Sequence, residues 1–129
     1  MNTYHIATVP GDGIGKEVIP ESVKVLNVVA AKCGFALKYK NYDYSCEHFK
    51  KYGKMMPDNG LEKLRDSDSI FLGAVGYPGV PDHISLWGLL IPIRRNFQQY
   101  VNLRPVKLLK GVASPLKNPG PVDFYIVRE

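Results

Sequence analysis

The chain has 129 residues, of which 45% are hydrophobic, so it can bury the core of one domain and we do not expect disorder. It carries 17 lysine and arginine residues against 12 acidic ones, a net charge of +5, but the basic residues lack interleaved aromatic ones, which argues against nucleic-acid binding. There is no signal-peptide pattern, no apolar run of about eighteen residues and no paired cysteine spacing, so we expect a cytoplasmic protein that is neither exported nor embedded in a membrane.

The beginning of the chain reads as strand, helix, strand. Residues His5 to Val9 predict a strand, which the glycine-rich segment Pro10 to Gly15 ends in a tight turn. Apolar residues at helical spacing from Lys16 predict a helix that Gly34 ends. The alternating residues Phe35 to Lys40 then predict a second strand.

Two short helices and a third strand are expected next. Residues Glu47 to Lys51 predict a short helix before Gly53, and Asn59 can cap another helix that runs to about Arg65. Residues Ser69 to Gly73 predict a short buried strand. The alternation of strands and helices indicates an α/β fold with a mostly parallel sheet and flanking helices.

The rest of the chain starts with a loop and continues with a helix and two strands. The loop Ala74 to Pro81 leaves the carboxyl end of the third strand, where open α/β sheets place their ligands. Residues Leu86 to Phe97 predict a helix in which Pro92 should cause a kink or a break. Residues Val101 to Leu108 and Phe124 to Val127 predict the last two strands.

The first candidate site is the turn Gly11-Asp12-Gly13-Ile14-Gly15. Its glycines permit a tight turn between strand and helix, from which exposed amides can meet a ligand. The spacing is neither the G-x-G-x-x-G fingerprint of dinucleotide binding nor a P-loop. From the sequence alone, a purely structural turn is an equally good interpretation.

The second candidate site is a helix face. Trp87, Leu90 and Arg94 follow one another at i, i+3 and i+7, so an arginine is expected on the same face as an apolar wall. The alternative is that Trp87 and Leu90 pack into the core while Arg94 and Arg95 reach the solvent.

Arg104 and Arg128 lie in strand-like apolar segments. A guanidinium in such a setting needs a carboxylate or phosphate partner, because an unpaired buried charge is costly. Together with Arg94, these arginines can hold the two carboxylates of a small acid. An ion pair with Asp123 or Glu129 is equally compatible with the composition.

These motifs together resemble the β-decarboxylating dehydrogenases, a family that includes isocitrate and isopropylmalate dehydrogenases. Five segments in the same order carry the resemblance: Val9 to Glu17, Gly73 to Gly76, Arg94, Asn102 to Pro105 and Ile126 to Glu129. Three others, Gly53 to Pro57, Val80 to Gly88 and Arg94-Arg95, resemble the branch of tartrate dehydrogenase and decarboxylating D-malate dehydrogenase. The resemblance covers essentially the whole chain and implies an isopropylmalate dehydrogenase-like fold.

The resemblance implies a role for each matching residue. By position, Arg94, Arg104 and Arg128 match the arginines that hold the substrate's carboxylates. Leu90 and the segment Ser85 to Trp87 match the part that faces the variable group of the substrate, and Trp87 argues against an isopropyl group. The residues that match segments near the nicotinamide of NAD are Gly11, Asp12, Gly13, Ile14, Ala74, Val75 and Gly76.

The chain departs from this family in its length. Family members continue with a catalytic tyrosine and lysine, aspartates that bind Mg²⁺ or Mn²⁺, and a loop that holds the adenosine of NAD. We therefore expect an incomplete fold, inactive by itself, with the metal ligands beyond Glu129. Residues 1–99 would begin the large α/β domain and residues 100–129 the second, dimerisation domain.

The expected function of the whole protein is the NAD-dependent oxidative decarboxylation of tartrate or D-malate by a homodimer. One alternative is a fragment of an isopropylmalate or isocitrate dehydrogenase, which Trp87 disfavours. A second alternative is a module that binds a dicarboxylate or pairs with a partner chain without catalysis.

Overall fold

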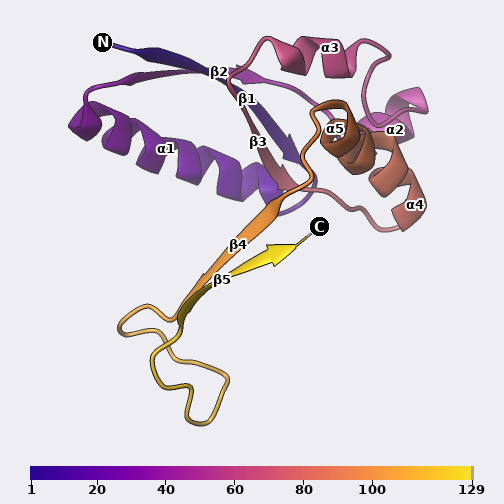
Figure 1. The fold of residues 1–129 in the computed structure, drawn as a ribbon. Coiled ribbons are helices and arrows are strands. Elements are labelled where there is room, and N and C mark those ends of the chain that lie inside the picture. Colours follow the sequence, from indigo (N-terminus) through magenta and orange to yellow (C-terminus); the bar gives the residue numbers. More distant parts are fainter. Residues whose placement is uncertain (129) are drawn as a thin grey trace.

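The computed structural model describes residues 1–128 as an α/β body followed by a long β-hairpin (Figure 1). The elements of the first part are β1 (Thr3–Gly11), α1 (Gly15–Cys33), β2 (Ala36–Asn41), α2 (Cys46–Tyr52), α3 (Gly60–Arg65) and β3 (Ser69–Ala74). They are followed by α4 (Asp82–Ser85), the π-helical turn η1 (Leu86–Leu90), α5 (Ile91–Asn96), β4 (Asn102–Lys107) and β5 (Asp123–Arg128).

Three parallel strands form the sheet of the body. The strand order is β2-β1-β3, so β1 lies in the centre and pairs on both sides. The carboxyl ends of parallel strands meet at one edge, and there Gly11 at the end of β1 pairs with Ala74 at the end of β3. The predicted α/β fold with a mostly parallel sheet and flanking helices is confirmed.

The helices of the first half begin and end where their sequence signals indicate. Gly34 closes α1 in the left-handed conformation, with φ of 74°, and its amide donates to the carbonyl of Ala30. Ser45 caps α2 by accepting a hydrogen bond from the amide of His48, and Gly53 ends that helix with φ of 74°. These caps confirm the predicted helices.

Two details of the predicted helices differ in the structure. Asn59 does precede α3, but its side chain makes no capping hydrogen bond. The helical run predicted from Leu86 begins earlier, at Asp82, and is interrupted by the π turn η1. Pro92 is the second residue of α5, directly after that turn, so it does mark a change in the helix. Because proline has no amide hydrogen, it cannot continue the α-helical bonding pattern there.

The main core lies between the sheet and helices α2 to α5. Ala7 and Val9 of β1 are fully buried against it, and Leu64, Leu89 and Ile93 come from the helices. Figure 1 shows α1 running along the sheet apart from this group of helices. On the α1 side an open, mostly apolar hollow of about 530 Å³ lies between this helix and the sheet. The buried core cluster therefore lies on the side of α2 to α5.

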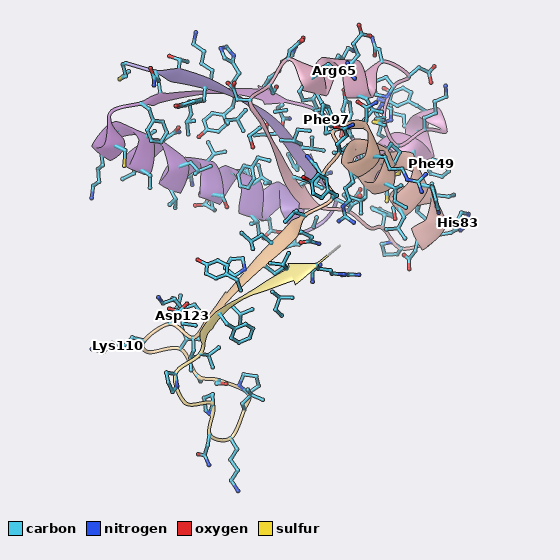
Figure 2. All side chains as sticks on the ribbon, in the orientation of Figure 1. Phe49, Arg65, His83, Phe97, Lys110 and Asp123 are labelled. Atoms are coloured by element: carbon cyan, nitrogen blue, oxygen red, sulfur yellow. The ribbon has the colours of Figure 1, made fainter. Side chains whose placement is uncertain are left out.

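Strands β4 and β5 pair antiparallel and project from the body as a hairpin. All six residues of β5 are exposed. In Figure 2, Lys110 and Asp123 stand at the far part of this hairpin, whereas Phe49 and Phe97 lie among the helices of the body. The domain division expected after residue 99 stays a prediction. Across residues 1–128, no helix has the length and apolar character needed to span a membrane.

Candidate functional site

The glycine-rich turn after β1 packs directly on the end of β3. A methyl group at Gly11 would lie 2.0 Å from the carbonyl oxygen of Ala74, and one at Gly15 would lie 2.0 Å from that of Pro10. Gly73 is equally restricted, since its methyl group would lie 2.3 Å from the oxygen of Pro10. Only glycine fits such close contacts between backbones. The turn thus has a structural role, and it brings together the two segments predicted to lie near the cofactor.

Asp12 joins this turn to two other segments. Its buried carboxylate accepts hydrogen bonds from the amides of Cys46 at 2.9 Å, Glu47 at 3.2 Å and Gly76 at 3.2 Å. Its own amide donates to Ala74 at 2.7 Å. The three amides satisfy the buried charge, as burial of a carboxylate requires. Asp12 therefore fixes the start of α2 and the loop after β3 to the turn.

Gly13 and Ile14 form the outer side of the turn and are exposed. A methyl group at Gly13 would meet nothing within 4 Å, so open space lies beside it. A small hollow of about 220 Å³ adjoins the turn, with Gly11 and Lys16 among its lining residues. The ammonium of Lys16 contacts the carboxylate of Glu47 at 2.5 Å, and this hydrogen bond raises the pKa of Lys16. The edge of the hollow therefore carries an ion pair.

Cys46 is buried behind the turn and carries no charge near neutral pH. Burial, together with its contact to Asp12, raises the pKa of its thiol to about 11. A thiolate is the nucleophilic form of cysteine, and the raised pKa disfavours it. Cys46 is thus a packing residue.

The hairpin places Arg104 and Arg128 on one face. Directly opposed residues of an antiparallel pair share a face, and so do alternate residues of one strand. Asn102 is opposite Arg128, and Arg104 follows Asn102 by two positions. Arg104 and Arg128 are therefore diagonal neighbours, which lie about 7–8 Å apart in such sheets.

Asn102 is a residue that the sequence reasoning did not select. Its side-chain oxygen accepts a hydrogen bond from Nε of Arg104 at 3.4 Å. Asn102 also lines a hollow of about 220 Å³ together with Arg94. Asn102 is thus hydrogen-bonded to Arg104, paired with Arg128 in the strand register, and lines the same hollow as Arg94. The alternation of Asn102 and Arg104 along the strand is the signal that could have identified it.

Asp123 forms its ion pair with Lys107 and not with one of the predicted substrate arginines. Nζ of Lys107 donates to the Asp123 carboxylate at 2.8 Å, and Lys107 is on the opposite face of β4 from Arg104. Within residues 1–128, none of the three predicted substrate arginines forms a salt bridge. The other partner considered, Glu129, lies outside the described residues. Arg104 is exposed, so solvent screens its charge in this structure.

The segment predicted to face the substrate's variable group lies on η1 and the helices beside it. Trp87 is 58% exposed, so the alternative that it packs into the core is wrong, while Leu90 is half-buried. Ser85 is buried, and its hydroxyl donates to the carbonyl of Asp82 at 3.0 Å. The expected shared face of Trp87 and Arg94 is altered, because the guanidinium over the Trp87 ring belongs to Arg95, 5.1 Å from the ring centroid.

Trp87 borders a cleft of about 520 Å³ between two segments that are distant in sequence. One wall is formed by residues 53–58 and the other by residues 83–88. These are the segments whose sequences resemble the tartrate and D-malate branch. Gly88 permits their contact, since a methyl group there would lie 2.6 Å from Cγ of Met55. The two segments that resemble the tartrate and D-malate branch are therefore in contact in the structure.

In the described part of the chain, no group of three or more His, Cys, Asp or Glu side chains is arranged to hold a metal ion. The predicted position of the metal ligands, beyond Glu129, lies outside residues 1–128.

The chain is similar to known decarboxylating dehydrogenases. The family model described as isocitrate/isopropylmalate dehydrogenase matches residues 5–129. The chain is 56% identical, over its full length, to the decarboxylating D-malate dehydrogenase of Escherichia coli (strain K12), and 50% identical, over 99% of its length, to the tartrate dehydrogenase/decarboxylase of Pseudomonas putida. A crystal structure of the β-decarboxylating dehydrogenase of Thermococcus kodakarensis matches with a TM-score of 0.65 and 26% identity over 97% of this chain.

The match covers only part of each of these proteins. The chain spans 37% of the length of the Escherichia coli protein, 36% of the Pseudomonas putida protein and 41% of the Thermococcus kodakarensis structure.

Proposed function

The chain belongs to the isocitrate/isopropylmalate dehydrogenase family, as its motifs predicted, and from this membership we propose that it is the amino-terminal part of an NAD-dependent oxidative decarboxylase of tartrate or D-malate. Its similarity to a D-malate and a tartrate dehydrogenase supports this substrate class. The whole protein would remove a hydride and a proton from the 2-hydroxy carbon and its hydroxyl, and then release CO₂.

The observation that carries the proposal is the arrangement of arginines around Asn102. Arg104 and Arg128 share one face of the hairpin, and Arg94 shares a hollow with Asn102. The three arginines are exposed, so solvent weakens their mutual repulsion, and their grouped positive charge favours an anionic ligand such as a dicarboxylate. A guanidinium can contact a carboxylate at two points, which fixes the orientation of the acid. The arginines would thereby hold the 2-hydroxy carbon in one position.

The turn at the carboxyl edge of the sheet fits a cofactor such as NAD. Open space lies beside Gly13, and Lys16, paired with Glu47, lines the adjoining hollow. In this proposal Gly11, Gly13 and Ile14 face the nicotinamide together with Ala74 to Gly76, while Asp12 holds these segments in place. NAD, when bound, accepts the hydride, and Mg²⁺ or Mn²⁺ supplies Lewis acidity for the loss of CO₂.

In this proposal the metal ligands and the acid-base residues are in the remainder of the whole protein, which acts as a homodimer. Leu90, Ser85 and Trp87 form the side of the site next to the variable part of the substrate. Trp87 is a bulky residue at this position and favours small acids over isopropylmalate.

The test is an activity assay with the whole protein that contains this chain. We expect NADH formation from D-malate or tartrate in the presence of NAD⁺ and Mn²⁺, and a much lower rate with isopropylmalate or isocitrate. The 129-residue chain alone should form no NADH under the same conditions. A preference of the whole protein for isopropylmalate or isocitrate would contradict the proposed substrate.

A further inference from the structure

The π turn η1 changes which residues face each other along the helical run from Asp82 to Asn96. The amide of Ile91 donates to the carbonyl of Leu86, five residues back. An α-helical bond would reach only four residues back, so the turn encloses one additional residue. The residue that lies two turns above Trp87 on the same face is therefore one position later in the sequence than it would be in an unbroken α-helix.

This shift explains why Arg95, and not Arg94, lies over Trp87. In an unbroken helix the residue stacked on position 87 would be at i+7, which is Arg94. With one residue added it is at i+8, and Arg95 is indeed found there, its guanidinium carbon 5.1 Å from the centroid of the Trp87 ring. This distance is within the range of a favourable cation–π contact. Arg94 does not lie over Trp87 and instead lines a hollow together with Asn102.

Trp87 depends on such a contact for a defined position. Its side chain is 58% exposed and borders the cleft beside residues 53–58. A largely exposed side chain can occupy several staggered rotamers unless a neighbour holds it. Arg95 is exposed and forms no salt bridge within residues 1–128, so no acidic side chain in this range competes with the indole for its charge.

We propose that Arg95 is a positioning residue that holds Trp87 against the substrate's variable group and thereby restricts the whole protein to small acids. The inference rests on the proposed function, because it deepens the role given there to Trp87. Arg94 and Arg95 then have separate tasks, since Arg94 faces the substrate's carboxylates and Arg95 faces the indole. The division between them follows from the single residue added by η1.

The first experiment measures the position of Trp87 directly. Trp87 is the only tryptophan among the 129 residues, so fluorescence excited at wavelengths that tryptophan absorbs and the eight tyrosines do not reports on that side chain alone. We expect Arg95→Gln to increase the quenching of this fluorescence by acrylamide, because the guanidinium no longer covers the ring. Arg95→Lys should restore part of the protection, since an ammonium can also lie over the ring but lacks a flat surface.

The matched control is Arg65→Gln. Arg65 is an exposed arginine that donates to the side chain of Asn96, next to Arg95 in sequence, at 3.1 Å. The substitution Arg65→Gln removes a positive charge from the same part of the surface without changing the side chain that lies over the indole. We expect this variant to leave the fluorescence unchanged, and far-UV circular dichroism should show equal helix content in all variants. Equal quenching in Arg95→Gln and the parent chain would overturn the proposal.

The second experiment measures substrate choice in the whole protein. Arg95→Gln should raise KM for D-malate or tartrate by about two- to fivefold with little change in kcat, which corresponds to the strength of an exposed cation–π contact. The ratio of kcat/KM for isopropylmalate to that for D-malate should rise as Trp87 becomes mobile. Arg95→Lys should lie between the parent and Arg95→Gln.

The outcomes separate this inference from the proposed function. A whole protein that oxidises neither D-malate nor tartrate would contradict the proposed function, and the fluorescence result would still decide whether Arg95 holds Trp87. If Arg95→Gln frees the indole but leaves the substrate ratio and KM unchanged, Arg95 has no part in specificity and the proposal is overturned.

Discussion

The body and the hairpin of this chain hold their candidate ligand residues in opposite ways. Every member of the buried core cluster belongs to the body, from Ala7 to Ile93, whereas all residues of β5 are exposed. The glycine-rich turn after β1 is fixed by close contacts between backbones and by the buried carboxylate of Asp12. Two of the three predicted substrate arginines, Arg104 and Arg128, stand on the exposed hairpin.

This contrast shows that the candidate ligand residues of one chain can be constrained by different forces. Substitutions in the turn should act through the stability of the body, because its segments support one another by packing. Substitutions of the hairpin arginines should act through ligand binding, because these side chains make few contacts within residues 1–128. The two regions can therefore be separated by matched pairs of variants.

The largest difference is expected between two leucines. Leu89 is fully buried in η1, and Leu89→Ala should lower the free energy of unfolding by about 2–5 kcal/mol, the usual cost of a core cavity. Leu103 of β4 is 57% exposed, so Leu103→Ala should change it by no more than about 0.5 kcal/mol. Urea denaturation of the two variants, followed by circular dichroism, measures both. Similar losses would mean that the hairpin is as well packed as the body.

A smaller difference is expected between two glycines with similar backbone angles. Gly11 has φ of 73° and Gly111 in the hairpin loop has φ of 87°, so alanine is strained at both. Only at Gly11 does the methyl group also meet a backbone oxygen, at 2.0 Å, whereas nothing lies within 4 Å of it at Gly111.

Gly11→Ala should therefore cost about 3 kcal/mol more than Gly111→Ala, as expected for overpacking against rigid backbone. The free energies of unfolding from the same urea titrations give the difference. If the two substitutions cost the same, the contact between the turn and β3 does not constrain the body, and the contrast drawn between the regions loses its basis.

Much of the body could be predicted because its signals are local. The glycines at residues 34 and 53 end their helices as expected, and the alternation of strands with helices indicates the parallel sheet. The role of Asp12 could not be predicted, because its partners Cys46 and Gly76 are 34 and 64 residues away in sequence. A hydrogen bond over such a separation leaves no local pattern.

The roles of the candidate site residues stay predictions, and the geometry among them could not be derived from the sequence. The spacing of the apolar residues gives no sign of the π turn. Arg95 lies over Trp87 where Arg94 was expected, and Pro92 is the one sequence signal of this difference. The pairing of Asn102 with Arg128 depends on the register of two strands, which the long connection between them does not specify.

The most direct test of the account is Arg104→Lys in the whole protein, compared with Lys107→Arg on the opposite face of the same strand. A lysine retains the charge but cannot reproduce the two-point contact of a guanidinium. We expect kcat/KM for D-malate or tartrate to fall on the order of tenfold to a hundredfold, which corresponds to a loss of about 1.5–3 kcal/mol of transition-state stabilisation. KM for NAD⁺ should barely change, and Lys107→Arg should behave like the parent protein. An unchanged kcat/KM for both acids, with weaker binding of NAD⁺, would contradict the assignment of these arginines to the substrate.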